Sequence, residues 1–144
     1  MRIVVLVGLP GSGKSTWLER LGVRGLSSDK IRGLLADDER DQTIHERVFQ
    51  TLRYLLRQRL EIARPVSYVD ATNLRVEERR PYIEMAREFG CEVEAVWFDV
   101  PLELCLVRNA ARERVVPEAA LIEMASRLAP PSADEGFSKV TRVV

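Results

Sequence analysis

A glycine-rich segment near the start of this 144-residue chain constrains its fold more than any other feature. It runs Gly8-Leu9-Pro10-Gly11-Ser12-Gly13-Lys14-Ser15 and follows directly on residues 3–7, an uninterrupted apolar run. A short run of this kind is typical of a strand that is buried on both faces of a parallel sheet. The glycines predict a tight turn, and residues 14–21 have the pattern of a helix. We therefore expect a strand, a turn and a helix in this order.

The same segment matches the pattern G-x-x-x-x-G-K-[ST] in full. Its glycines let backbone N–H groups approach phosphate oxygens that a Cβ atom would block. Lys14 would place its ammonium on the β and γ phosphates, Ser15 would offer its hydroxyl to Mg²⁺, and the helix would add its positive N-terminal end. The motif predicts a site for ATP and Mg²⁺ but does not define the reaction. The residues expected to hold the nucleotide are Gly8, Gly11, Ser12, Gly13, Lys14, Ser15 and Thr16.

The rest of the chain alternates between apolar runs and helical patterns. Further strands are expected over residues 66–69, 92–100 and 139–144, with a short one ending near residue 27. Helices are expected over residues 28–35, 42–62, 101–109 and 117–128. Another should end near residue 88, with Pro81 tolerable only in its first turn. Strands that alternate with helices predict an α/β fold, with about five parallel strands covered on both faces.

We find no internal repeat or linker that would divide the chain, so we expect a single domain over residues 1–144. Ligands of such sheets bind beyond the carboxyl ends of the strands. The 22 basic and 22 acidic residues give a net charge of zero, which argues against a protein that coats long nucleic acids. A site that holds one strand end needs few phosphate contacts and is compatible with this charge.

Other features exclude several classes of site. No apolar run is long enough to cross a bilayer, so no membrane partner is expected. The two cysteines are well separated and there is one histidine, so we expect neither a disulfide partner nor a zinc cluster. Reduced cysteines fit a cytoplasmic protein. Nothing in the pattern indicates an oligomeric state.

Asp29 and Arg32 are candidates for the acceptor side of a phosphoryl transfer. They follow the point where the short second strand should end, so Asp29 could face the γ-phosphate. A carboxylate there can orient a hydroxyl and accept its proton. Arg32 lies one helical turn further on and could hold a phosphate of the acceptor. The alternative is that Ser28 or Asp29 only caps the helix that begins there.

A second polar group follows the strand predicted at residues 66–69. Asp70 could orient Mg²⁺-bound water or an arginine of the site, and Thr72 and Asn73 could contact the substrate from the same strand end. The alternative is that all three belong to a turn.

Arg108 and Arg112 lie between two predicted helices. They are four residues apart, so they share one face if a helix continues through both. We predict a lid at about residues 108–116 that brings both arginines over the donor phosphates, where Arg112 would neutralise charge on the transferring group. The alternative is a solvated basic helix end.

In order and spacing, these motifs resemble the kinase domain of polynucleotide 5′-hydroxyl kinases, the end-healing enzymes of phages and bacteria. The matching segments are residues 8–16, 28–32, 69–74, 98–101, 108–112, 116–118, 130–131 and 135–137. The resemblance implies an adenylate-kinase-like P-loop fold with ATP·Mg²⁺ as the phosphate donor. It also implies that Asp29 is the general base, that Arg32 binds acceptor phosphate, that Asp70 supports the site, and that Arg108 and Arg112 are lid arginines. The D-x-D motif of a phosphatase partner domain is absent from the sequence.

Three functions follow as hypotheses. The first is a kinase that phosphorylates the 5′-hydroxyl end of DNA or RNA. The second is a P-loop kinase of a small molecule such as a sugar, a nucleoside or an antibiotic, because related kinases share these motifs. The third is an ATP-binding regulatory module without an acceptor, against which the presence of Lys14, Asp29 and the lid arginines argues.

Overall fold

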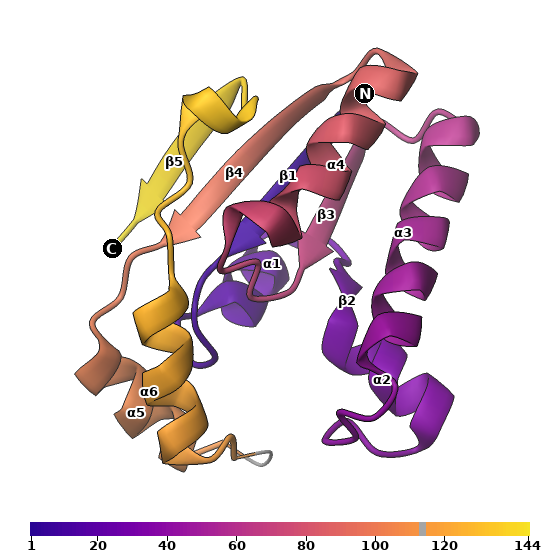
Figure 1. The fold of residues 1–144 in the computed structure, drawn as a ribbon. Helices are drawn as coiled ribbons and strands as arrows, with labels where there is room; N and C mark the ends of the chain where they lie inside the picture. The colour runs from indigo at the N-terminus through magenta and orange to yellow at the C-terminus, as the bar shows by residue number, and fades with distance from the viewer. Residues whose placement is uncertain (113–114) are drawn as a thin grey trace.

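A computed structural model describes residues 1–112 and 115–144 (Figure 1). Within these residues, the strands form one parallel sheet in the order β2-β3-β1-β4-β5. The strands are β1 (Arg2–Val7), β2 (Leu26–Ser27), β3 (Val66–Asp70), β4 (Glu92–Phe98) and β5 (Lys139–Val143). The helices are α1 (Lys14–Leu21), α2 (Ser28–Ala36), α3 (His45–Glu61), α4 (Val76–Phe89), α5 (Leu102–Ala110), α6 (Glu118–Arg127) and the 3₁₀ turn η1 (Ala133–Glu135). The predicted P-loop fold is confirmed.

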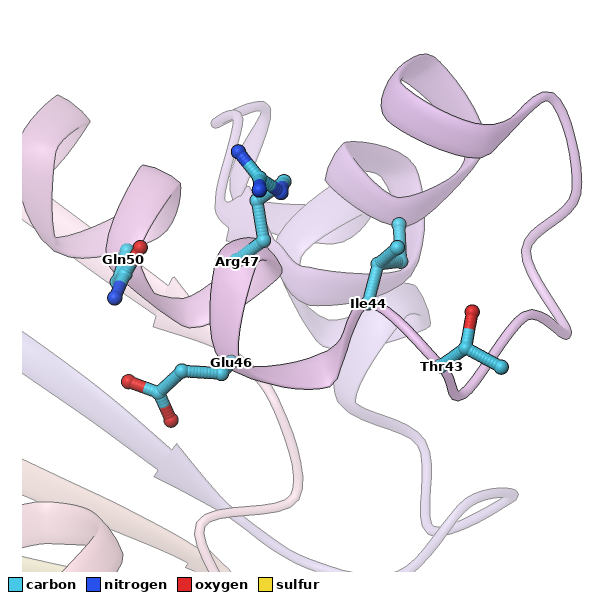
Figure 2. A pocket seen from close by; sticks show the side chains of 5 residues that line it. All are labelled: Thr43, Ile44, Glu46, Arg47 and Gln50. Carbon is cyan, nitrogen blue, oxygen red and sulfur yellow. The ribbon is translucent and has the colours of Figure 1, made fainter.

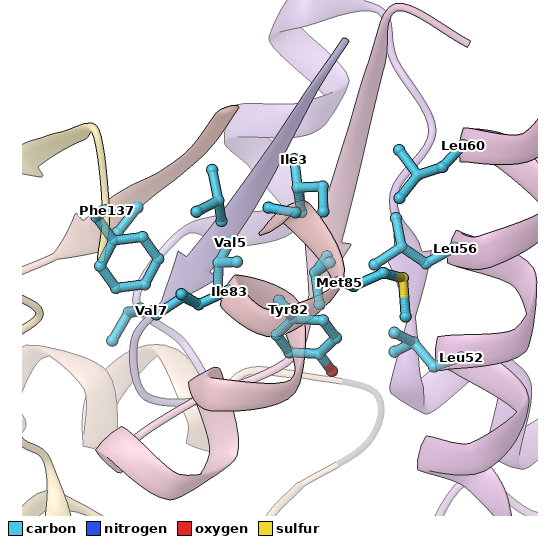
Figure 3. Packing of buried hydrophobic residues seen from close by; sticks show 14 of the residues in the cluster. Ile3, Val5, Val7, Leu52, Leu56, Leu60, Tyr82, Ile83, Met85 and Phe137 are labelled. Carbon is cyan, nitrogen blue, oxygen red and sulfur yellow. The ribbon is translucent and has the colours of Figure 1, made fainter. Parts of the chain in front are cut away.

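The central strand β1 explains why its sequence is apolar throughout. Its alternate side chains Ile3, Val5 and Val7 pack into a core with α3 and α4 (Figure 3). Val4 and Leu6 point to the opposite face and pack with Leu18 of α1. Both faces of the strand are therefore buried, as expected for the middle of a parallel sheet.

A third apolar cluster lies under the helices that follow β4. It joins Leu9 of the glycine-rich loop to Cys105 of α5 and Leu121 of α6, and all three side chains are buried. Apolar packing thus links the loop to α5 and α6, the helices before and after the segment predicted to be a lid. Both cysteines are free, and no helix in the described part of the chain is long and apolar enough to span a membrane.

The prediction for Pro81 was wrong. Pro81 is the sixth residue of α4, not part of its first turn. A proline here removes one N–H from the helix ladder and strains the preceding turn. Three neighbours, Tyr82, Ile83 and Ala86, are buried in the core. This packing outweighs the local cost.

The strands all run in one direction, so their carboxyl ends lie at one edge of the sheet (Figure 1). The glycine-rich loop, residues 8–13, leaves this edge from β1. On one side of the edge lies α2, and on the other side lie α5 and α6. The segments that carry the predicted site residues therefore surround the same edge.

Candidate active site

The glycine-rich loop is shaped by close packing as well as by backbone conformation. Gly11 and Gly13 have φ angles of 82° and 101°, which favour glycine. A Cβ atom on Gly11 would lie 2.9 Å from the carbonyl oxygen of Cys105, and one on Gly8 would lie 2.6 Å from Ser12 Oγ. From sequence, these glycines were explained by access for phosphate. The structure adds that Gly11 lets α5 lie directly against the loop.

The N-terminus of α1 fits a bound phosphate. Gly13 precedes the helix in a left-handed conformation, and no described side chain caps the first turn. The first N–H groups of an α-helix have no partner within the helix, so they can donate to an anion. Ser15 and Thr16 are exposed at this end. The loop and the first turn of α1 therefore suit the phosphates of ATP, and the Ser15 hydroxyl could hold Mg²⁺.

Lys14 is at the centre of the site. Its ammonium donates to the carbonyl oxygens of Gly8 at 2.8 Å and Leu9 at 2.9 Å. Burial lowers the pKa of Lys14 to about 8, although the charges of Asp70 and Asp29 act to raise this pKa. Arg112 lowers it further. Asp29, Asp70 and Arg112 come from three different segments, and each lies close enough to Lys14 for its charge to affect the Lys14 pKa.

On the other side of the site, α2 carries Asp29. The side chain of Ser27 accepts a hydrogen bond from the backbone N–H of Lys30 at 3.2 Å, so Ser27 caps this helix. The alternative that Ser28 or Asp29 is the cap is wrong. The guanidinium of Arg32 donates to the Asp29 carboxylate at 3.2 Å.

Arg32 is an unusual residue because its charge is buried. It is only 4% exposed, and its Nε atom has no hydrogen-bond partner among the described residues. The cost of removing this guanidinium from water has already been met in folding, so an anion that binds its unused N–H donor does not add that cost again. This geometry fits the predicted contact with an acceptor phosphate.

Asp70 ends β3 beside Ser27 of β2. Burial raises its pKa, and the nearby charge of Lys14 opposes this rise. The next residues bind the end of β1: the Gly8 N–H donates to the Thr72 carbonyl oxygen at 3.0 Å, and the Asn73 amide donates to the Leu6 carbonyl oxygen at 2.7 Å. Asn73 is buried, with a φ of 48°. These bonds give Thr72 and Asn73 a structural role, and their contact with substrate stays a prediction.

The predicted lid begins in α5. Arg108 Nη1 donates to the carbonyl oxygen of Gly11 at 3.4 Å. Arg112 lies beyond Ala110, the last residue of α5, so the two arginines do not share one continuous helical face. Arg108 thus reaches the glycine-rich loop from α5, and the turn after α5 brings the charge of Arg112 near Lys14. Residues 113–114 of the predicted lid lie outside the described residues.

Sequence analysis gave no role to Arg79 or Asn109, and both are buried. Arg79 donates from Nε and Nη2 to the carboxylate of Glu135 at 2.8 and 2.9 Å, and from Nη1 to the carbonyl oxygens of Asn73 and Leu74 at 2.9 and 3.1 Å. One signal could have identified it. Arg79 stands three and four residues before Tyr82 and Ile83, on the apolar face of α4.

The structure also has a hollow at the start of α3 (Figure 2). It is lined by Thr43, Ile44, Glu46, Arg47 and Gln50. None of the predicted site residues lines it. The candidate site therefore rests on the residues around Lys14, not on this hollow.

Comparison with known proteins supports the nucleotide-binding side of the site. The sequence model of the AAA domain family matches residues 3–131. The bifunctional polynucleotide phosphatase/kinase of Schizosaccharomyces pombe is 28% identical over 98% of this chain and 33% of its own length. The L-seryl-tRNA(Sec) kinase of Methanococcus maripaludis is 25% identical over 90% of this chain and 53% of its own length. The chain thus spans between a third and about half of these relatives.

Solved structures show the same fold. A chain of the Pnkp1/Rnl/Hen1 RNA repair complex has a TM-score of 0.73 with this protein at 22% identity. The similarity covers 88% of this chain and 43% of that chain. At this level of identity the likeness establishes the P-loop architecture.

Proposed function

The chain belongs to the AAA domain family, and from this premise we propose that it transfers the γ-phosphoryl group of ATP to the 5′-hydroxyl end of DNA or RNA. The observation that supports this most is the placement of Asp29 near Lys14 together with its ion pair to the buried Arg32. One side of the site suits donor phosphates, and the other offers a carboxylate for a hydroxyl and a guanidinium for an acceptor phosphate.

In this reaction the acceptor hydroxyl oxygen forms a bond to the γ-phosphorus, and the bond to the oxygen that bridges the β and γ phosphates breaks. Asp29 would orient the hydroxyl and take its proton, and ADP would leave. Lys14 would hold the β and γ phosphates, and Arg112 would stabilise the charge that spreads over the transferring group. Ser15 would be the protein ligand of Mg²⁺, which neutralises phosphate charge when it is bound.

The proposed donor contacts are made by the loop residues Gly8 to Thr16 and by Arg108. The proposed substrate-binding residues on the acceptor side are Arg32, Asp70, Thr72 and Asn73, and Asp70 also supports the site. We propose that residues 1–144 form one kinase domain, with a lid at about residues 108–116. Nucleic acid is preferred as the acceptor because the first relative is a polynucleotide phosphatase/kinase and because Arg32 can hold a phosphate next to the reacting hydroxyl.

The test is transfer of labelled γ-phosphate from ATP·Mg²⁺ to DNA and RNA oligonucleotides with a free 5′-hydroxyl. The same oligonucleotides with a 5′-phosphate are the blocked controls. Asp29→Ala should slow transfer by about 10²–10⁴-fold, which is the usual contribution of a general base. It should leave the Kd for ATP nearly unchanged, since Asp29 serves the acceptor. Asp134→Ala, which removes an exposed carboxylate from η1, should keep both values.

Arg32→Ala should raise the KM for the oligonucleotide more than the KM for ATP. An unchanged transfer rate in Asp29→Ala would remove Asp29 from the role of general base. If the protein binds ATP but labels neither DNA nor RNA, the same assay with nucleosides and sugars tests the small-molecule alternative. If none of these acceptors is labelled, the chain would be an ATP-binding module.

A further inference from the structure

We infer that Asn109 is a positioning residue that holds Arg112 beside the glycine-rich loop. Asn109 is 3% exposed. Its side-chain amide donates to the carbonyl oxygen of Val116 at 2.6 Å and accepts from the N–H of Val116 at 3.0 Å. Its backbone carbonyl oxygen accepts from the N–H of Arg112 at 3.1 Å. One residue therefore binds the main chain at Arg112 and again at Val116.

Asn109 is itself fixed against the loop. It lies in the last turn of α5, where the helix approaches Gly11. A Cβ atom on Gly11 would lie 3.5 Å from the backbone nitrogen of Asn109 and 2.9 Å from the carbonyl oxygen of Cys105. The contact leaves almost no space between helix and loop. The backbone of Arg112 is thus tied through Asn109 to the loop that would bind the phosphates, and the charge of Arg112 is close enough to lower the pKa of Lys14.

Asparagine suits this position because its amide offers one donor and one acceptor. The backbone of Val116 needs both, since Val116 is itself buried. Aspartate keeps the shape but loses the donor, and alanine loses both groups. The inference rests on the proposed role of Arg112 at the donor phosphates. It does not depend on which acceptor is phosphorylated.

The test is a double-mutant cycle on the Kd for ATP·Mg²⁺, measured by calorimetry without any acceptor. Arg112→Ala should weaken binding about tenfold, the value of one charge-assisted hydrogen bond. Asn109→Ala should weaken it about threefold to tenfold. The double variant should bind no more weakly than Arg112→Ala alone, because Asn109 acts through Arg112. Asn109→Asp, which keeps the volume of the side chain, should behave like Asn109→Ala.

The matched control is Ser67→Ala. Ser67 is also buried and accepts a hydrogen bond from Arg59 Nε at 2.9 Å, but it lies toward the opposite end of β3. Ser67→Ala should lower the Tm and leave the Kd for ATP unchanged. In the double variant with Arg112→Ala, the losses of stability should add, and the effect of Arg112→Ala on the Kd for ATP should not change.

Independent effects of Asn109 and Arg112 on the Kd would overturn the inference, as would an unchanged Kd in a folded Asn109→Asp protein. An unchanged Kd in Arg112→Ala would overturn it as well. Failure of the proposed function would give a different result. Oligonucleotides would stay unlabelled, while Asn109→Ala and Arg112→Ala would still show coupled effects on the Kd for ATP.

Discussion

At the scale of single residues, the sequence could nominate Lys14 from its motif and Asp29 as one of two alternatives from spacing, but it could not give the environment of either residue. The pKa of Lys14 depends on burial and on charges contributed by β3, α2 and the turn after α5. These neighbours are far from Lys14 in the sequence. The burial of Arg32 also depends on distant parts of the chain. The sequence shows only a basic residue about one turn into a helix, and it does not show which residues surround this side chain.

The lowered pKa of Lys14 predicts that ATP binding is linked to protons. In the free protein, a growing fraction of Lys14 is neutral as the pH rises through about 8. The phosphates of ATP favour the ammonium form, so binding should raise this pKa. Binding near pH 9 should therefore take up protons, approaching about one per site, and the Kd should rise with pH. Calorimetry in two buffers of different ionisation enthalpy measures the uptake.

The control is Lys14→Met, which cannot take up this proton. Its residual ATP binding should be weak and should show no proton uptake near pH 9. Equal proton uptake by the two proteins would mean that another group titrates on binding.

At the scale of elements, local patterns were sufficient where an element is long or has a motif. Residues 14–21 form a helix as expected, and β1 is buried on both faces. The long amphipathic helix predicted over residues 42–62 is α3, His45–Glu61. The end of β2 near residue 27 was expected from its place between two helices. Its residues could not be identified from periodicity, because a strand of two residues is too short to show any. The helix predicted over residues 101–109 is α5, Leu102–Ala110. The bonds of the Asn109 side chain to Val116 were not foreseen, because such a turn leaves no periodic signal.

The contact between the glycine-rich loop and α5 gives a prediction for Gly11→Ala. Alanine at this position would have to adopt a positive φ, and its Cβ atom would lie 2.9 Å from the Cys105 carbonyl oxygen. Backbone strain and overpacking together should cost about 2–4 kcal/mol of unfolding free energy. The shift of α5 should also weaken ATP binding by about tenfold or more. Urea denaturation and calorimetry measure the two effects.

Gly90→Ala is the control for the backbone part of this effect. Gly90 has a φ of 65°, and a Cβ atom there would meet nothing within 4 Å. It should cost about 1 kcal/mol from conformation alone and leave the Kd for ATP unchanged. An equal loss of stability in both variants, with ATP binding intact, would show that the loop does not depend on the close approach of α5.

At the scale of the whole molecule, the order of strands and helices in the sequence predicted the parallel sheet. Nothing in that order indicated how the segment after α6 is secured. Arg79 of α4 binds the Glu135 carboxylate with two hydrogen bonds and also donates to the Ala129 carbonyl oxygen at 2.9 Å. Such long-range pairs have no local pattern, which is why sequence analysis missed them.

Arg79→Ala should lower the unfolding free energy by about 3–5 kcal/mol, because it leaves the Glu135 carboxylate, whose side chain is 7% exposed, without its cationic partner and with only the Ser132 N–H bound to it. The control is Arg57→Ala. Arg57 also binds a carboxylate with two hydrogen bonds, from Nη1 and Nη2 to Glu88, but this pair is exposed to solvent. Its loss should shift the urea midpoint only slightly, since exposed ion pairs contribute little. Similar midpoints for the two variants would contradict a special role for burial.

The hydrogen bonds between the ends of β1 and β3 divide the site into a fixed half and an adjustable half. The Gly8 N–H binds the Thr72 carbonyl oxygen, and the Asn73 side-chain amide binds the Leu6 carbonyl oxygen, so the start of the glycine-rich loop is tied to the segment after β3. Asp29, in contrast, follows an edge strand of only two residues. If Asp29 serves the acceptor as proposed, substitutions around α2 should change the acceptor side and leave the bonds between the glycine-rich loop and the segment after β3 in place. A fold built in this way can change its acceptor during evolution while the chemistry at the donor stays the same.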